Sequence, residues 1–200
     1  MRYRDYKIFR PGFYYHIFNR GNNKQQIFFD ATDYLAFLTR LKIVLGLSVP
    51  DWRIKIRPLE SNSFSILSYC LMPNHFHFLI KQNKDIGINR LMAKLCTGYA
   101  MYFNKKHERI GNVFQDAFKA KVVENDTYAK YVSAYIHNNP KNLDYDYSSY
   151  KSVVGLQNDQ IVDRGILLSW FDNDPSKYRK FVETFTEKDE ERIKDGLFDI

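Results

Sequence analysis

The chain has 200 residues, and its 30 Lys and Arg against 23 Asp and Glu give a net charge of +7. This length suits one domain with a substantial core, and the positive charge favours anionic partners, with nucleic acid first among them. Two cysteines are too few for a disulfide framework or a zinc-ligand set, and no run of residues is apolar enough to cross a membrane. Because the N-terminus also lacks the apolar core of a secretion signal, we expect a cytoplasmic protein without a membrane partner.

The aromatic residues favour single-stranded nucleic acid as the partner. The chain has 15 Tyr and 16 Phe, and although most must lie in the core, rings beside cations are what proteins use to bind single strands. Bases stack on the rings while Lys and Arg side chains follow the phosphates. Seven basic side chains are candidate phosphate contacts: Arg10, Arg20, Lys24, Lys105, Lys106, Lys119 and Lys121.

The first predicted elements are a strand and a helix. Alternation over residues 13–19 predicts a strand, and a turn rich in Asn and Gly follows it. Asp30 has the chemistry of a helix N-cap, with Asp33 three residues later. Apolar residues at helical spacing then continue to Gly46, where we expect the helix to end. These helical positions are Tyr34, Leu35, Leu38, Leu41 and Leu45.

A hairpin is predicted after an irregular segment. Residues 47–63 show little periodicity, although Ile54 and Ile56 suggest a short strand there. Two β-prone runs follow over 64–72 and 75–82, and the turn residues Pro73-Asn74 separate them.

A pair of histidines opens the second strand of this hairpin. Successive strand side chains point to opposite faces, so His75 and His77 share one face with Leu79. Phe76 and Phe78 lie on the other face and would hold the strand to a core. Two imidazoles on one strand face can reach a single metal ion. They can equally be solvated on a half-exposed strand, and this pattern alone leaves both interpretations open.

The second half of the chain alternates between helical and extended patterns. Helical spacing predicts a helix over 88–106, an extended basic segment covers 113–123, and a third helix runs from Thr127 to a stop at Pro140. The succession of strand, helix, two strands, helix, strand and helix predicts an α+β fold of the ferredoxin-like kind, with helices packed on an antiparallel sheet.

Beyond the third helix the chain reads as an extension. A Tyr-rich linker is followed by two predicted short helices, 166–172 and 175–186, and by a charged segment that we expect to be a solvated helix face. We therefore divide the chain into a domain over residues 1–150 and a helical C-terminal extension over 151–200.

The third predicted helix carries a polar stripe. Tyr131, Tyr135 and Asn139 recur at i, i+4 and i+8, which places them on one side of the helix. Such a stripe is also compatible with ordinary packing, and an Asn before a Pro is also typical of a helix C-cap.

Three ordered segments, 13–23, 69–77 and 135–140, together resemble the single-tyrosine HUH transposases. More narrowly, they resemble the REP-associated tyrosine transposases and their insertion-sequence relatives, over roughly residues 11–150. Three motifs in order are far more specific than a lone His-x-His pair. The resemblance implies a ferredoxin-like endonuclease that acts on single-stranded or hairpin DNA.

The resemblance also implies roles for four residues. His75 and His77 match the two histidines that bind a divalent metal, Mg²⁺ or Mn²⁺, and Tyr135 matches the nucleophile. Asn139 matches the position that completes the metal site, where insertion-sequence members have Gln and the REP-associated branch has Asn before Pro. The product would be a 5′-phosphotyrosine and a free 3′-OH.

Other candidates have weaker cases. Tyr99 and Tyr102 lie among apolar residues that favour a packing role. His137 is two residues from Tyr135, so on a helix it faces elsewhere, and we expect it to be solvated. Gln115 also falls where relatives carry Gln, without an evident chemical role.

Two other functions remain open at this level. A module of the same fold could hold nucleic acid without cutting it, and a metal-dependent phosphoesterase would use water instead of a tyrosine as the nucleophile. The sequence leaves a monomer and a homodimer equally open.

Overall fold

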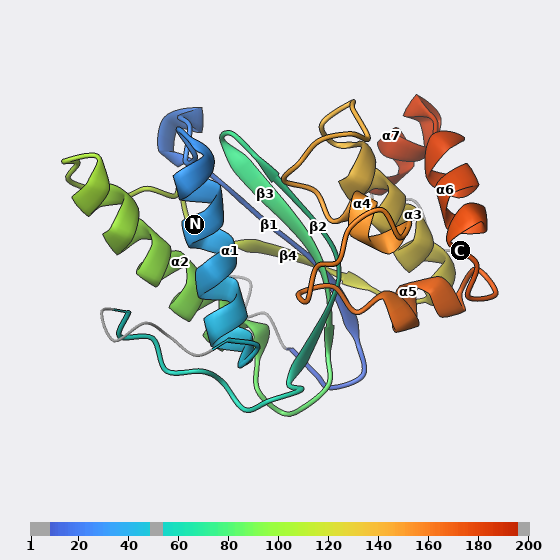
Figure 1. Cartoon of the computed structure of the whole chain (residues 1–200), viewed down its shortest axis with the longest axis horizontal. Helices are drawn as coiled ribbons and strands as arrows, with labels where there is room; N and C mark the ends of the chain where they lie inside the picture. Colours follow the sequence, from blue (N-terminus) through green and yellow to red (C-terminus); the bar gives the residue numbers. More distant parts are fainter. Residues whose placement is uncertain (1–8, 49–53, 196–200) are drawn as a thin grey trace.

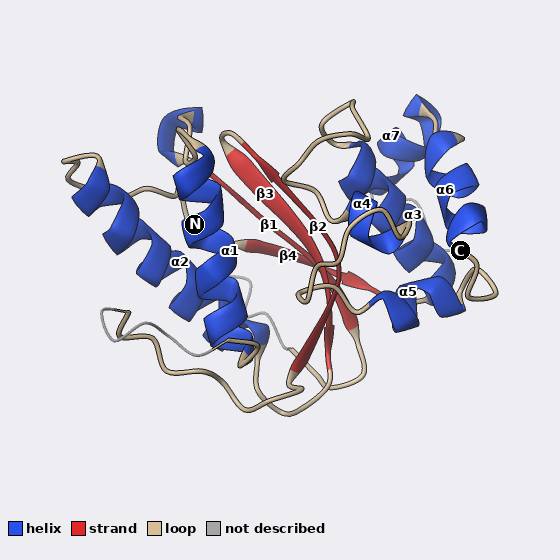
Figure 2. Cartoon of the chain, viewed as in Figure 1, coloured by secondary structure: helices blue, strands red, loops and turns tan. Residues whose placement is uncertain are grey.

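The structure is a computed structural model, and it describes residues 9–48 and 54–195. Its centre is a four-stranded antiparallel sheet with the strand order β2-β3-β1-β4 (Figure 1). Helices cover both faces of this sheet (Figure 2). The strands are β1 (Tyr14–Arg20), β2 (Phe64–Met72), β3 (His75–Gln82) and β4 (Lys119–Val123).

The helices form a layer on each side of the sheet. Two long helices lie together on one face, and the later helices gather on the other (Figure 1). The succession of elements and the strand order are those of a ferredoxin-like unit, so the predicted α+β fold is confirmed. The helices are α1 (Ala31–Leu45), α2 (Ile88–Lys106), α3 (Asp126–Asn138), α4 (Tyr150–Val153), α5 (Arg164–Ser169), α6 (Pro175–Glu183) and α7 (Glu187–Asp195), with a short 3-10 helix, η1 (Asn22–Lys24).

Local signals in the sequence set the ends of α1. The side chain of Asp30 accepts a hydrogen bond from the Asp33 N–H, as an N-cap does. Gly46 ends the helix with a φ of 75°, in the left-handed region that glycine adopts without a steric penalty. The predicted apolar stripe is right except at Leu35, which is 60% exposed, while Phe37 is fully buried in its place.

Two extended segments differ from the prediction. Residues 54–56 form no strand; the Ile56 side chain instead lies close to Gly98 on α2, where an added Cβ would approach it to 3.1 Å. The segment 113–123 pairs as a regular strand only from Lys119 onward. Ile56 therefore serves a packing contact and not strand pairing, whereas Phe114, ahead of β4, forms only an isolated bridge with Gly21.

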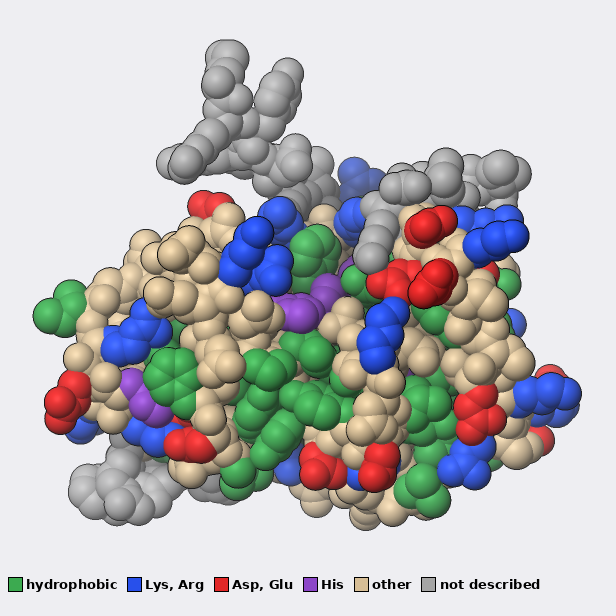
Figure 3. All heavy atoms as spheres, turned by 90° about the horizontal axis from the view of Figure 1, so that it is seen from above, with side chains coloured by type: hydrophobic (Ala, Val, Ile, Leu, Met, Phe, Trp, Pro, Cys, Tyr) green, Lys and Arg blue, Asp and Glu red, His purple; other side chains and the backbone are tan. Residues whose placement is uncertain are grey.

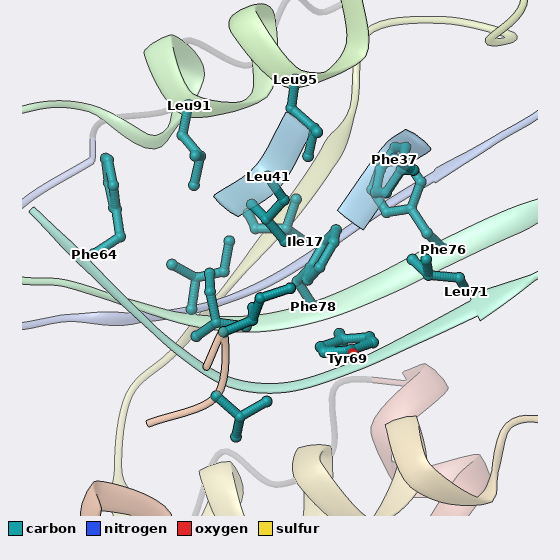
Figure 4. Close-up of a cluster of buried hydrophobic side chains, with 14 of the residues drawn as sticks. Ile17, Phe37, Leu41, Phe64, Tyr69, Leu71, Phe76, Phe78, Leu91 and Leu95 are labelled. Atoms are coloured by element: carbon teal, nitrogen blue, oxygen red, sulfur yellow. The ribbon is translucent and has the colours of Figure 1, made fainter. Parts of the chain in front are cut away.

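The main core lies between the sheet and the helices α1 and α2. Phe76 and Phe78 project from β3 toward Phe37 and Leu41 of α1, as predicted from the strand alternation (Figure 4). Burial of each such side chain stabilises the fold by about 1.5–3 kcal/mol. The histidine-bearing strand is thus anchored through this face, and His75 and His77 lie on the other one.

The other face of the sheet is covered by α3. Val132 and Ile136 of this helix pack on Leu79 of β3 and Cys70 of β2 in a smaller apolar cluster. The Asn125 side chain caps the start of α3 by accepting a hydrogen bond from the Tyr128 N–H. The cap and this packing fix where the end of α3 lies over the sheet.

The C-terminal helices pack against the outer side of α3. Tyr178 and Val182 of α6 are buried, and Ile193 of α7, which lies in the segment expected to be solvated, is only 2% exposed. The two predicted short helices are present with earlier ends, at Ser169 and Glu183. Among the described residues, no helix is both long and apolar enough to cross a membrane.

Candidate active site

The candidate site lies where β1, β3 and α3 meet. In the antiparallel register Arg20 pairs with His75 and Phe18 pairs with His77, so these side chains share the face of the sheet that α3 covers. Lys119 of β4 pairs with Phe18 and extends the same face. Residues from distant parts of the chain are therefore brought together by strand pairing.

A pocket of about 360 Å³ opens at this point. In the space-filling view, histidine side chains show near the middle of the molecular face, with Lys and Arg side chains close by (Figure 3). The lining combines residues with imidazole, phenol, amide and cationic groups and one acidic residue, Asp116, around one small volume. Its residues are Phe18, Asn19, Arg20, His75, His77, Gln115, Asp116, Ala117, Lys119, Tyr135 and Asn139.

His75 stands between two asparagines. Its Nδ1 lies 2.7 Å from Oδ1 of Asn74, and its Nε2 lies 3.0 Å from Oδ1 of Asn139. Burial lowers the pKa of His75, with Arg20 adding to the shift and the contact with Asn139 opposing it. The neutral ring has a single N–H, so it can donate to only one of these two oxygens.

His77 is more deeply buried and contacts a second histidine. Its Nδ1 lies 2.9 Å from Nε2 of His16 on β1, and the two side chains belong to residues that are 7% and 3% exposed. Burial first, and then His16 and His75, hold the pKa of His77 well below its usual value. Burial, with Lys121 adding to it, lowers the pKa of His16 to about 3. Both rings are therefore neutral near pH 7.

Tyr135 of α3 lies over the two buried histidines. Its ring centroid is 5.8 Å from that of His16 and 5.6 Å from that of His77, both in edge-on orientation. Tyr135 is 9% exposed and lines the pocket. Tyr131, the first residue of the predicted stripe, does not join it there, because its ring packs edge-on against Phe181 of α6.

Asn139 was considered from the sequence both as a helix C-cap and as a residue of the metal site, and its position is compatible with both. It is the C-cap residue of α3, and its N–H reaches the carbonyl of Ile136 at 3.4 Å. Its side-chain oxygen nevertheless faces His75, one helical turn beyond Tyr135.

The donor set fits a divalent cation. Neutral His75 can donate a hydrogen bond to only one of Asn74 and Asn139. At its other contact, an unprotonated ring nitrogen therefore lies beside an amide oxygen, and both atoms are acceptors. A cation between His75 Nε2 and Asn139 Oδ1 would satisfy both atoms, and imidazole nitrogen and amide oxygen are both ligands of divalent metals. Within residues 9–48 and 54–195 no group of three or more His, Cys, Asp or Glu is arranged to hold a metal. Such a site would thus have few protein ligands and open positions.

The seven candidate phosphate contacts separate in space. Arg20 and Lys119 line the pocket, and Lys121 lies on the same face of β4, opposite His16. Lys106 is held by Asp30 and Asp33 at 2.7 and 2.8 Å. The remaining candidates, Arg10, Lys24 and Lys105, are exposed outside the pocket lining.

The other tyrosines considered as nucleophiles lie on the opposite side of the sheet. Tyr99 is fully buried in the main core, and its hydroxyl donates to the carbonyl of Ile27. The Tyr102 hydroxyl lies 3.3 Å from a carboxylate oxygen of Asp33. The packing role that the sequence favours for both residues agrees with these contacts.

The expectation that His137 is solvated is wrong. His137 is 0% exposed, with Nε2 at 2.8 Å from Oγ of Ser149 and Nδ1 at 2.7 Å from the hydroxyl of Tyr178. The helix does turn His137 away from the pocket, but the C-terminal helix α6 covers that side. The sequence analysis did not foresee this cover because α6 is distant along the chain.

Three residues in or beside the pocket were missed or left without a role. His16 lies in the predicted first strand, but its contact with His77 depends on a register that local patterns do not reveal. Asn19 is 7% exposed and donates from Nδ2 to the Asp116 carbonyl at 3.1 Å, which holds the segment 113–117 beside β1. Gln115 lies in that segment, and its N–H donates to the Arg20 carbonyl at 2.9 Å.

Comparisons with known proteins show a family match and a likeness of fold. Residues 50–139 match the family model described as "Transposase IS200 like", a span that contains the His75–His77 pair and reaches Asn139. The structure is similar to that of a REP-associated tyrosine transposase bound to a REP hairpin, with a TM-score of 0.57, 16% identity, and coverage of 82% of this chain and 98% of that one. A candidate transposase from Deinococcus radiodurans R1 aligns with a TM-score of 0.41, 15% identity, and coverage of 72% and 97%. A search of curated proteins gave no match.

These findings have two consequences. The likeness to the REP-associated enzyme is one of fold, and it agrees with the ferredoxin-like architecture derived above. The family match confirms the predicted resemblance over a span that contains the motif 69–77 and all of the motif 135–140 except Pro140, and it supports a transposase function. The motif 13–23 lies outside the matched residues.

Proposed function

Because residues 50–139 match the IS200-like transposases, we propose that this chain nicks single-stranded or hairpin DNA and transfers the cut strand through a covalent phosphotyrosine. The observation that supports this proposal most strongly is the composition of one pocket. A phenol, two neutral imidazoles, an amide oxygen and two cations meet there around a volume of about 360 Å³. This set combines a potential nucleophile, potential metal ligands and cations that can pair with phosphate oxygens.

Tyr135 is the proposed nucleophile. Its phenolic oxygen attacks the phosphorus of a DNA phosphodiester, the bond from phosphorus to the 3′ oxygen breaks, and a 5′-phosphotyrosine forms. The phenolic proton is released to water in the open pocket, and the leaving 3′ oxygen takes up a proton to become a free 3′-OH. Attack by this 3′-OH, or by another, on the phosphotyrosine reverses the step and rejoins the strands.

The residues around Tyr135 would prepare the phosphate for this attack. His75, His77 and Asn139 would hold a divalent cation, Mg²⁺ or Mn²⁺, which when bound polarises the phosphodiester and counters the charge that develops on it. Arg20 and Lys119 line the same pocket and would pair with phosphate oxygens of the bound strand.

Two alternatives remain distinct from this proposal. A binding module of the same fold would use the cations and Phe18 but would have no use for Tyr135 beside the imidazoles. A phosphoesterase with a water nucleophile would release both products, whereas a tyrosine transferase retains one of them on the protein.

The test is covalent trapping. Single-stranded DNA with a terminal label is incubated with the protein and Mn²⁺ and analysed by denaturing electrophoresis. We expect wild type to form a labelled protein adduct and Tyr135→Phe to form none, with the loss exceeding about 100-fold because a covalent nucleophile has been removed.

The matched control is Tyr102→Phe, which removes a hydroxyl on the opposite side of the sheet. It should form the adduct at the wild-type rate. An adduct in the Tyr135 variant would refute the assignment of the nucleophile. Cleavage without any adduct would favour the phosphoesterase, and binding without cleavage would favour the binding module.

A further inference from the structure

We infer that His16 is a positioning residue for the metal site: its Nε2 accepts the Nδ1–H of His77 and so directs the free lone pair of His77 to Nε2. The inference rests on the proposed function, because it assigns a role toward the cation that His75, His77 and Asn139 would hold. His16 has no role in the motifs from which the resemblance was drawn other than membership of a strand.

The geometry of the pair carries the inference. His16 Nε2 and His77 Nδ1 are 2.9 Å apart, a normal hydrogen-bond length, and the ring centroids are 5.1 Å apart. In the β1–β3 register His16 pairs with Leu79, so His77 is its diagonal neighbour on the same face of the sheet. Both side chains are more than nine-tenths buried, and Phe18 stacks on His77 at 5.6 Å. The rings are thus fixed in place.

The chemistry of a neutral imidazole allows only two proton arrangements for this pair. In the first, His77 donates from Nδ1 to His16, and the Nε2 of His77 keeps a lone pair with which it can bind a cation. In the second, His16 donates from Nε2, and the proton of His77 moves to its own Nε2, which can then bind no cation. The proton on His16 therefore decides whether His77 can serve as a ligand.

The other ring nitrogen of His16, Nδ1, leaves both proton arrangements of the His16–His77 pair accessible. Within the described part of the chain, His16 Nδ1 is buried and has no hydrogen-bond partner. No neighbour therefore holds the His16 proton on one nitrogen, and both arrangements stay accessible. A cation at Nε2 of His77 selects the first arrangement, and His16 stabilises that arrangement by accepting the bond.

The first measurement is the tautomer of His77 in the wild-type protein. Long-range ¹H–¹⁵N NMR spectra are recorded without metal and with saturating Mg²⁺, which is diamagnetic. We expect the Mg²⁺-bound protein to show His77 protonated at Nδ1 and unprotonated at Nε2. A proton found on Nε2 of His77 in the presence of bound Mg²⁺ would overturn the inference.

The second measurement is Mn²⁺ affinity by calorimetry in two His16 variants. His16→Leu removes the acceptor and should weaken binding by about 10–100-fold, the usual effect of losing a hydrogen-bond partner of a ligating histidine. His16→Gln keeps an acceptor oxygen and should recover most of the affinity. Thermal unfolding of each variant shows whether the metal-free fold is retained.

The matched control is His107→Leu. His107 is also a hydrogen-bonded histidine, with Nε2 3.0 Å from a carboxylate oxygen of Asp33, but it lies at the end of α2 and outside the pocket. This variant should lose stability and keep wild-type Mn²⁺ affinity, which separates a positioning role from the general cost of removing a hydrogen-bonded histidine.

The Mn²⁺ affinity of His75→Ala distinguishes a failure of this inference from a failure of the proposed function. Lost affinity in His75→Ala together with unchanged affinity in His16→Leu would overturn the role of His16 and leave the metal site standing. Unchanged affinity in His75→Ala would overturn both.

Discussion

Two adjacent asparagines at the end of α3 face different parts of the molecule. Asn139 turns its side-chain oxygen to His75 at 3.0 Å. Asn138 instead donates from Nδ2 to the carbonyls of Ala134 and Val182, at 3.1 and 3.0 Å. The residue that would contribute to the site is thus distinguished from its neighbour only by the phase of the helix.

We predict that Asn139→Ala weakens Mn²⁺ binding at least about tenfold, because it removes one of three proposed protein ligands. Asn139→Asp keeps an oxygen at the same place, adds a negative charge, and should bind at least as tightly as wild type. Asn138→Ala should leave metal affinity unchanged and lower stability by about 1 kcal/mol through its lost hydrogen bonds. Calorimetry and urea denaturation measure the two effects, and equal affinity in wild type and Asn139→Ala would exclude Asn139 as a ligand.

The site residues differ in how far the sequence could predict them. Strand alternation is sufficient to put His75 and His77 on one face, and helical phase is sufficient to put Tyr135 and Asn139 on one side. His16 could not be found in this way, because its contact with His77, 61 residues away in the chain, depends on how two strands pair. Local periodicity fixes the face of a side chain but not its neighbour across the sheet.

At the scale of elements, α3 is held from two sides by buried polar contacts. His137 joins the hydroxyl of Tyr178 on α6 to Oγ of Ser149, and that oxygen lies 2.8 Å from the N–H of Tyr69 on β2. Burial lowers the pKa of His137 to about 3, so the ring is neutral and its bonds are those of a neutral imidazole. This network fixes the helix that carries Tyr135 between the sheet and the C-terminal helices.

Tyr178→Phe tests the contribution of this network. The substitution removes one hydroxyl, which lies 2.7 Å from Nδ1 of His137 and 3.2 Å from Oγ of Ser133. Since both partners are buried, we expect a loss of about 1–3 kcal/mol in the free energy of unfolding, measured by urea denaturation. A variant as stable as wild type would show that the contact contributes nothing to holding α3.

A charged cluster joins the start of α1 to the end of α2. The Asp33 carboxylate is 0% exposed and accepts hydrogen bonds from Lys106 Nζ at 2.8 Å and from the Phe29 N–H at 2.8 Å. His107 Nε2 lies at 3.0 Å from the same carboxylate. Burial by itself would raise the pKa of Asp33, but the hydrogen bonds from Lys106, Phe29 and His107 outweigh it and hold the pKa below its usual value.

This cluster predicts a pH-dependent stability. Because the folded-state pKa of Asp33 lies below the unfolded value, ionised Asp33 stabilises the fold above about pH 4, and this contribution is lost as the pH falls through the folded pKa. Asp33→Asn should cost about 2–3 kcal/mol at pH 7, the range for hydrogen bonds to a charged group. In urea denaturation the difference from wild type should shrink at pH 3. A difference that stays constant between pH 7 and pH 3 would contradict this assignment.

The elements that the sequence predicts well are those with their own local signals. α1 has a cap at each end, and β2 and β3 are separated by Pro73-Asn74, so their bounds follow from neighbouring residues. α7 was expected to be a solvated helix, because its many charged residues conceal the one apolar residue, Ile193, that packs on α3. Burial by a distant element leaves little trace in the local pattern.

At the scale of the whole molecule, charge is distributed unevenly around the site. Arg20 and Lys119 line the pocket, whereas Lys106 is neutralised by Asp30 and Asp33 near the far end of α2. The net charge of +7 by itself would attract DNA to any face. Under the proposed function, this arrangement would lead the bound strand across the face that carries the histidines.

The last prediction concerns this path. A protein that neutralises phosphates releases counterions, so the logarithm of the affinity for a single strand falls with the logarithm of salt concentration by about 0.7 per phosphate contact. We expect Arg20→Gln and Lys119→Gln each to weaken binding of a labelled single strand and to lower this slope by about 0.7. Fluorescence anisotropy across a salt titration measures both quantities. An equal-length duplex should bind more weakly at every salt concentration, because paired bases cannot stack on rings such as the partly exposed Phe18. Lys105→Gln is the matched control: Lys105 is exposed on α2, on the opposite face of the sheet, and its loss should leave the slope unchanged. If Lys105→Gln lowers the slope while Arg20→Gln and Lys119→Gln do not, the strand follows α2 and cannot reach Tyr135 in the geometry that covalent transfer requires.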